Sequence, residues 1–371
     1  MNKRIVIKGS YGETNFGDDL LMCVLENFFL EKFPNDSIVF MGEKNDYVNK
    51  LLKKASFISK NKEVHADMLV YGGGTQFFAF VKEANLYVAL VRSLFHLLKT
   101  DRIQLYNLIL KKLSFRKNSA AVRVSSIGLG LGPFKENSRA EKASELFLQN
   151  SNYLAVRDQV SLDYCHKWGL KNAILGADIC FSDYLDLKTN TNDQIDYVRE
   201  KKRIGIIVRD WSHDKEGRAY YNSLLKYAEV YDNDAEVEIQ FIIFAPKKDL
   251  EWIRILKGKN VLYWDPSNTT VSQFFSKMND FDSFISSRYH GAIFGALLGK
   301  PVICIEIEPK LRILTNQIKE LYLWEKPFSV NALVALTPLL EKSVNYEKSI
   351  SNLRSLSNDM FSDFEQYLKR I

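Results

Sequence analysis

Residues 282–310 constrain the fold more strongly than any other part of the sequence. Glycines recur there at every fourth position, at Gly291, Gly295 and Gly299, so a helix built on them has one nearly bare face that can lie close to a sheet. The apolar run 302–305 that follows has the composition of a strand covered on both faces. The segment therefore predicts a strand, a helix and a second strand of a parallel sheet.

Charged and titratable side chains stand at the turns of this unit. Arg288 and His290 lie where the helix is expected to begin, and Lys310 follows the second strand. A helix start presents free backbone N–H groups and the positive end of a dipole, and neighbouring parallel strands end at the edge where open α/β sheets bind ligands. We therefore expect an anion site that contains a titratable group. The alternative is that Arg288 pairs with a carboxylate and His290 caps the helix.

Strand and helix patterns alternate along all 371 residues, a length that allows two or three domains. Both halves open alike, because residues 3–9 and 202–209 each combine a basic entry with a buried strand. We expect an α/β fold with two parallel-sheet domains. The expected divisions are an N-terminal domain at 1–186, a polar linker at 187–201, a C-terminal domain at 202–342 and a final helix at 343–371 that packs back on the first domain.

The net charge of +6 is concentrated in one segment. Residues 82–117 hold eight Lys or Arg against two Asp or Glu, so the rest of the chain is neutral overall. Their apolar positions are spaced as two amphipathic helices. Such an insertion suits an anionic membrane surface or a lipid-linked substrate; a helical pair packed on its own domain or on a second copy of the chain is the alternative. Because the charge is confined to this segment, we expect no nucleic-acid binding.

Targeting and metal-binding signals are weak. The N-terminus shows no leader, and no apolar run approaches the ~18 residues of a membrane span. We expect a cytoplasmic protein, peripheral at the inner face of the cell membrane if residues 82–117 contact lipid. No carboxylate cluster indicates a metal, and the cysteines are scattered as small core residues. They are Cys23, Cys165, Cys180 and Cys304.

Glycine-bearing loops follow the predicted strands of the first half. Residues 9–19 lie between the first strand and the first helix, where backbone amides could cradle a phosphate or a sugar. Asn15 and Asp18 in this loop are candidates for binding sugar hydroxyls. The glycines are not spaced as G-x-G-x-x-G, and Glu43 is an unconvincing ribose partner, so a nicotinamide cofactor is not expected. Residues 72–74 also bring bare backbone to the sheet edge, although a single glycine loop is as often a tight turn.

Two further arginines follow predicted strands. Arg157 comes after the run 153–156, and Arg209 after the first strand of the second half. Either could contribute to an anion site. The alternatives are local pairs with Asp158 and Asp210.

Short motifs stand in order along most of the chain: Tyr11, Gly12, Asn15, Gly17 and Asp18; the glycines 72–74; Gly130, Gly132, Pro133 and Phe134; Val156, Arg157, Asp158 and Ser161; and residues 287–291 through Lys310. In these motifs the chain resembles the polysaccharide pyruvyl transferase family. This resemblance implies two Rossmann-like domains in a GT-B-like arrangement with the active site in the interdomain cleft, phosphoenolpyruvate as donor and co-substrate, and no other cofactor. It also implies a sugar of a surface polysaccharide, or of its lipid-linked precursor, as acceptor, and a pyruvate ketal as product.

With this resemblance, His290 is the candidate general acid and base, with Arg288 beside it. A small donor that carries both a phosphate and a carboxylate requires several fixed cations. Arginine suits either group, because its guanidinium binds each with paired hydrogen bonds. The expected donor-binding residues are Arg209, Lys310, Arg157 and Gly291. The expected acceptor-binding residues are Asn15, Asp18, Tyr11, Gly73 and Gly74.

Two rival functions share this pattern. A sugar-nucleotide glycosyltransferase of the GT-B type would need an acidic residue for ribose hydroxyls, and Glu306 or Glu308 is suitably placed in the sequence. A non-catalytic glycan-binding protein is the third possibility. The acceptor sugar, the ketal position and the oligomeric state, homo-oligomer included, are left open by the sequence.

Overall fold

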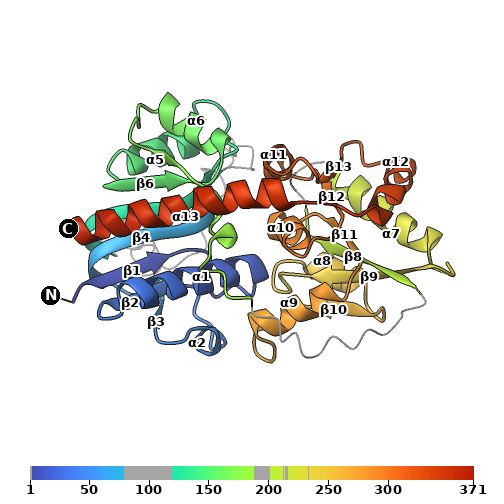
Figure 1. Ribbon diagram of the computed structural model, residues 1–371, viewed down its shortest axis with the longest axis horizontal. Coiled ribbons are helices and arrows are strands. Elements are labelled where there is room, and N and C mark those ends of the chain that lie inside the picture. The colour runs from blue at the N-terminus through green and yellow to red at the C-terminus, as the bar shows by residue number, and fades with distance from the viewer. Residues whose placement is uncertain (1, 79–118, 188–200, 212, 214–215, 233) are drawn as a thin grey trace, which may run out of the picture.

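The computed structural model describes residues 2–78, 119–187, 201–211, 213, 216–232 and 234–371, and it contains two α/β domains, each built on a parallel sheet (Figure 1). This confirms the fold class expected from the alternating strands and helices. The basic insertion expected at 82–117 and all but the ends of the expected linker lie outside the described residues.

The N-terminal domain has a seven-stranded sheet in the order β3-β2-β1-β4-β5-β6-β7, and every pair of neighbouring strands is parallel. Its elements are β1 (Arg4–Lys8), α1 (Phe16–Lys32), β2 (Ser37–Gly42), α2 (Val48–Leu51), β3 (Ser56–Ser59), β4 (Val64–Phe77), β5 (Ser119–Leu131), α5 (Arg139–Leu148), β6 (Tyr153–Val156), α6 (Gln159–Lys167), β7 (Ile174–Leu175) and a 3₁₀ turn, η1 (Ile179–Phe181).

The C-terminal domain has a six-stranded parallel sheet in the order β10-β9-β8-β11-β12-β13. Its elements are β8 (Lys202–Val208), α7 (Glu216–Val230), β9 (Val237–Ile243), α8 (Leu250–Ile255), β10 (Val261–Tyr263), α9 (Val271–Asn279), β11 (Ser283–Ser286), α10 (Tyr289–Leu297), β12 (Val302–Ile305), α11 (Pro309–Gln317), β13 (Tyr322–Trp324), α12 (Val330–Leu336), η3 (Thr337–Glu341) and α13 (Glu347–Arg370).

The glycine face of α10 packs on the second sheet, as its spacing predicts. A Cβ at Gly291 would lie 2.5 Å from Ser286 Oγ, and one at Gly295 would lie 2.3 Å from Val302 Cγ2, so both positions require glycine for the helix to approach the strands. Gly299 has a different role. It adopts a φ of +69° just after the helix, which is the left-handed conformation that ends helices at low cost.

Helix α13 runs from the second domain across the first (Figure 1). Its buried face carries Met360, Phe361 and Phe364, and the ring of Phe361 lies 4.8 Å from that of Phe28 in α1. The apolar face of α13 is therefore the surface by which this final helix covers the first domain.

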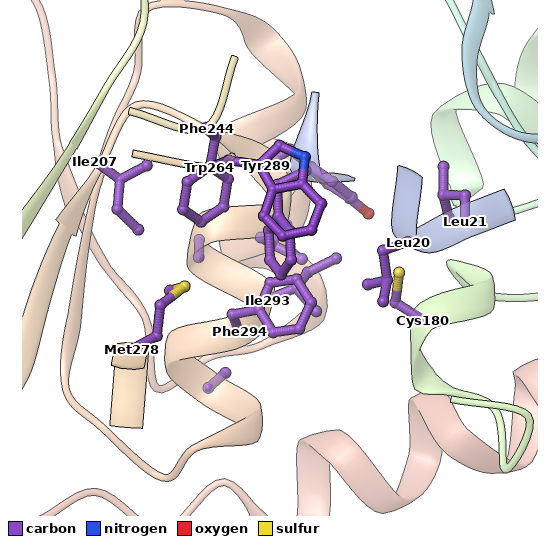
Figure 2. Close-up of a cluster of buried hydrophobic side chains, with 14 of the residues drawn as sticks. Leu20, Leu21, Cys180, Ile207, Phe244, Trp264, Met278, Tyr289, Ile293 and Phe294 are labelled. Carbon is purple, nitrogen blue, oxygen red and sulfur yellow. The ribbon is translucent and has the colours of Figure 1, made fainter. Parts of the chain in front are cut away.

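The start of α1 reaches into the second domain. Phe16 is fully buried in a socket of aromatic rings from the second domain, with centroids 4.7–5.1 Å away. Its backbone N–H also donates to the carbonyl oxygen of Phe244 at 3.0 Å. Figure 2 shows part of this cluster, with Leu20 and Leu21 on the side of the first domain. The socket rings are those of Phe244, Trp264, Phe274 and Phe294.

A buried carboxyl group adds a polar contact to this interface. Asp19 is inaccessible to solvent and accepts hydrogen bonds from the Tyr47 hydroxyl and, across the interface, from the Trp264 indole N–H, both at 2.8 Å. Burial raises the pKa of Asp19 to about 7, although these two hydrogen bonds oppose the shift. The folded protein therefore holds this proton at pH values where the unfolded chain has released it.

We expect this difference to make folding stability depend on pH. Between pH 4 and 7 the folded state binds the Asp19 proton and the unfolded state does not, so the wild type should lose on the order of 1 kcal/mol of stability per pH unit as pH rises. Asp19→Asn removes the titration, so its urea-unfolding free energy should lack this decline. If the unfolding free energies of the wild type and the variant changed equally with pH between 4.5 and 7, the prediction would be contradicted.

Candidate active site

A cleft of about 440 Å³ lies between the two domains, at the carboxyl ends of strands from both sheets. Most of the residues singled out in the sequence reach its wall. From the first domain these are Asn15, Asp18, Gly74, Gly130 and Arg157, and from the second domain Arg209, Arg288, His290, Glu308 and Lys310.

Arg288 occupies the N-cap position of α10, between β11 and the helix. The Ser286 hydroxyl holds this turn by accepting from the Arg288 N–H and donating to its carbonyl oxygen. The guanidinium donates to both carboxylate oxygens of Asp249, and its Nε–H donates to the Val208 carbonyl oxygen at 3.3 Å. Arg288 is only 8% exposed, so the carboxylate pair left open by the sequence is present, with a partner that the sequence did not indicate.

Arg209 and Lys310 share one carboxylate. Both form ion pairs with Glu308 Oε1, Lys310 at 2.9 Å, while Glu308 is 2% exposed. Burial favours the protonated form of Glu308, but the two cations outweigh it and lower the pKa of the carboxyl. Two positive charges against one negative leave an excess of positive charge on this wall. The expected alternative for Arg209 is not seen, because Asp210 accepts from the N–H groups of Glu251 and Trp252 instead.

Arg157 is buried between two carboxylates. Its Nη1 lies 3.0 Å from Asp178 Oδ2, and its Nε lies 3.6 Å from Asp158 Oδ2. Its Nη2 donates to the Thr75 hydroxyl at 2.8 Å, and the guanidinium carbon lies 4.2 Å from the ring centroid of Tyr289. Only 2% of Arg157 is exposed. The alternative pair with Asp158 is therefore present, and a direct role in donor binding stays a prediction.

His290 lies in the first turn of α10 and reaches toward the first domain. Its Nε2 is 3.6 Å from Asp178 Oδ2, and 12% of the side chain is exposed. Asp178 is fully buried and also accepts from the Cys180 N–H at 3.1 Å. Burial favours the protonated form of Asp178, but His290, Arg157 and this N–H together lower the pKa of the carboxyl. Asp178 was not among the residues expected at this site, because its one local signal in the sequence is an aspartate just before a short apolar turn.

Gly17 is the closest backbone neighbour of the His290 ring. A Cβ at position 17 would lie 2.1 Å from His290 Nδ1. Only a glycine therefore lets the start of α1 pass the imidazole. This close approach explains why position 17 requires a glycine.

The acceptor candidates divide into two groups. Asn15 and Asp18 line the cleft and are hydrogen-bonded to each other at 2.5 Å, and Gly74 lies beside them. Tyr11 and Gly73 lie behind the cleft wall. The Tyr11 hydroxyl is buried and donates to the Gly72 carbonyl oxygen at 2.7 Å, while Gly73 packs against Ile179 and Leu21. Both support the loop conformation from behind.

The donor candidate Gly291 is likewise buried. Its packing against Ser286 and Ile207 places it behind the cleft, so its part is to bring α10 close to the sheet.

One group of side chains has the composition of a metal site. The ligand atoms of Asp178, Cys180 and His290 lie within 4.8 Å of one another, a cluster that the sequence did not indicate. Two features oppose a cation there. The Arg157 guanidinium already holds the Asp178 carboxylate, and burial raises the pKa of the Cys180 thiol well above its usual value. We therefore keep the prediction that the protein uses no metal at this site.

Within the described residues, no helix combines the length and apolar character that crossing a membrane would require. Contact of residues 82–117 with a membrane lies outside what the structure describes.

A family model described as polysaccharide pyruvyl transferase matches residues 15–309, well over half of the chain. No curated protein matches this chain.

Solved structures support the arrangement of the domains. A UDP-GlcNAc 2-epimerase of Methanocaldococcus jannaschii is 14% identical, covers 100% of both chains and has a TM-score of 0.60. The UDP co-structure of MnaA from S. aureus is 11% identical, with 100% of this chain and 98% of that chain covered and a TM-score of 0.59. The UDP-GlcNAc 2-epimerase of Neisseria meningitidis is 13% identical over 100% of both chains, with a TM-score of 0.57. At these identities the likeness shows the fold alone, and it confirms the GT-B-like arrangement.

The contact between Gly17 and His290 predicts an unusual response to alanine. Gly17→Ala in a helix would normally gain up to ~1 kcal/mol, but here the added methyl group meets the imidazole, and overpacking typically costs about 1–3 kcal/mol. We expect a lower melting temperature and a lower urea-unfolding free energy. The control is the same substitution in a His290→Ala background, where the loss should be much smaller because only the contact with the Cβ of residue 290, at 3.1 Å, remains. An equal loss in both backgrounds would place the clash elsewhere.

Proposed function

This chain belongs to the polysaccharide pyruvyl transferase family, and we propose that it transfers the enolpyruvyl group of phosphoenolpyruvate to a sugar of a surface polysaccharide or of its lipid-linked precursor. The product is a pyruvate ketal that bridges two hydroxyls of one sugar. The observation that carries the proposal is the set of cations around His290 on one wall of the interdomain cleft.

The donor side of the cleft suits a small, doubly charged ligand. A guanidinium has five N–H donors and an ammonium three, so Arg209 and Lys310 retain donors after each has bonded to Glu308. Their side chains are 23% and 27% exposed, which leaves part of each open to a ligand. A phosphate bound there would be close to the start of α10, where backbone N–H groups and the helix dipole also favour an anion.

The proposed chemistry needs one proton relay. A sugar oxygen bonds to C2 of the enol as its hydroxyl proton is removed, and the methylene carbon gains a proton. Phosphate then leaves with the electrons of its C2–O bond, and a second hydroxyl bonds to C2 to close the ketal, its proton going to the departing phosphate. His290 lines the cleft and is the imidazole among its described lining residues, so we assign it the transfer of the proton from the hydroxyl to the methylene carbon. Asn15 and Asp18 on the opposite wall are then placed to orient the acceptor hydroxyls.

The rival glycosyltransferase function is less well supported. It needs a carboxylate for the ribose hydroxyls of a nucleotide, but Glu306 is paired with Arg312, and Glu308 with the two cations of the donor wall. Neither carboxylate is unpaired. A cytoplasmic location, contact of residues 82–117 with lipid and self-association all stay predictions.

Ligand-induced stabilisation tests the donor. Phosphoenolpyruvate at 100 times its dissociation constant should stabilise the protein by about 2.7 kcal/mol and raise its melting temperature, whereas UDP-sugars and GDP-sugars should not. Arg209→Gln should reduce the shift, because it replaces a charged donor of the wall with a neutral one. Release of inorganic phosphate with an acceptor glycan, together with a ketal signal on the product, completes the test. A shift with nucleotide sugars only would favour the glycosyltransferase.

Donor affinity should fall at alkaline pH. Burial lowers the pKa of Lys310 to about 8, although Glu308 opposes the shift. A bound dianion favours the charged lysine, so binding takes up a proton above pH 8 and weakens as pH rises. We expect phosphoenolpyruvate affinity to fall by up to about tenfold between pH 7 and 9.5. A loss of this size corresponds to the free energy of one charge-assisted hydrogen bond. Lys310→Arg stays charged over this range, so an equally steep loss in calorimetric titrations of that variant would contradict the assignment.

A further inference from the structure

We propose that Asp178 positions His290 across the domain interface, by accepting a hydrogen bond from Nε2–H so that the proton of the neutral imidazole is held there and Nδ1 is left free to exchange protons. This inference deepens the proposed function and rests on it, because it assigns a partner to the residue that moves the proton. It concerns a residue that belongs to neither the donor set nor the acceptor set.

The geometry brings the two groups almost into contact. His290 Nε2 and Asp178 Oδ2 are 3.6 Å apart, beyond the usual range of a hydrogen bond by roughly 0.5 Å. Nε2 is buried and has no hydrogen-bond partner among the residues that the structure describes. A buried N–H without a partner costs free energy, and the Asp178 carboxylate is the acceptor that faces Nε2.

The carboxylate is held as a fixed anion. Asp178 accepts from the Cys180 N–H through Oδ1 and from Arg157 Nη1 through Oδ2, at 3.1 Å and 3.0 Å. These bonds orient the carboxylate, and with His290 they lower the pKa of Asp178 despite its complete burial. Asp178 thus offers His290 an acceptor that neither rotates nor takes up the proton.

An ionised carboxylate can only accept hydrogen bonds, and a neutral imidazole has one N–H donor. Asp178 therefore selects the form of His290 with the proton on Nε2, which leaves the lone pair on Nδ1. The ring can then take one proton from the acceptor hydroxyl as its oxygen bonds to C2, and return one proton to the methylene carbon, so that the imidazole ends the addition unchanged. In serine proteases a buried aspartate orients the catalytic histidine in this way.

The pair spans the two domains. His290 belongs to α10 of the second domain, whereas Asp178 and Gly17 both belong to the first. Asp178 faces Nε2, and the backbone of Gly17 packs beside Nδ1, so two parts of the first domain position the imidazole, while 12% of the side chain stays exposed at the cleft. The working tautomer of His290 therefore depends on the domains being together, as the burial of Phe16 in its aromatic socket keeps them.

The direct test is nitrogen-15 NMR of the ligand-free protein labelled in histidine, with His290→Gln to assign the ring signals. The wild type should show the Nε2–H form. Asp178→Asn, whose amide can donate to Nε2, should move the population toward Nδ1–H and lower kcat by about 100-fold or more with a small change in KM. The matched control is Asp158→Asn, because Asp158 also lies beside Arg157 but its partners are the start of α6 and that arginine. This control should leave the tautomer of His290 unchanged.

Three results would overturn the proposal. One is a wild-type spectrum with the proton on Nδ1, which needs no variant and so remains decisive if Asp178→Asn fails to fold. A second is the same change of tautomer in the Asp158 variant, since the effect would then act through Arg157. A third is displacement of the His290 signals by a chelator, which would make Asp178 a metal ligand.

The proposal and the proposed function can fail separately. A switch of tautomer in Asp178→Asn, in a protein that phosphoenolpyruvate does not stabilise, would support the pairing and reject the donor.

Discussion

The insertion of the start of α1 into the second domain is the contact on which the rest of the structure depends. Phe16 fills an aromatic socket of the other domain, and a fully buried phenylalanine contributes several kcal/mol to such a contact. One residue later, Gly17 allows the same helix to pass the His290 ring. The helix that joins the domains therefore also forms one side of the pocket around the candidate catalytic base, and stability and function share a single contact.

The cleft shows how a protein can keep several cations close together before a ligand arrives. Each of these four cations has a carboxylate partner: Asp249 for Arg288, Glu308 for Arg209 and Lys310, and Asp178 for Arg157. Without partners, the desolvation of these charges would cost more than the fold could offset. The sharing of Glu308 between two cations is what leaves positive charge for an anionic donor. The wall is thus preorganised, with its donors already oriented.

Much of this arrangement could be predicted because it is local. The strand–helix–strand unit around Arg288 and His290, the glycine face of α10 and the placement of Arg209 and Lys310 at strand ends all follow from periodicity and from the geometry of parallel sheets. The partners of these cations could not be predicted, because Glu308 lies 99 positions from Arg209 and Asp249 lies 39 positions from Arg288. Tyr11 was expected to bind the acceptor because it belongs to a motif of the family resemblance, but its hydroxyl bonds to the chain behind the cleft.

The sequence by itself determined the two α/β domains, the family and the sheet edge that carries the charged groups. These properties are written in hydrophobic periodicity and in short motifs, which act over a few residues. Only the tertiary structure decided which charges meet, that Asp178 of one domain faces His290 of the other, and that Gly17 lies against the same ring. The reason is physical: the electrostatic state of a buried group is set by what surrounds it in space, and those neighbours come from both domains.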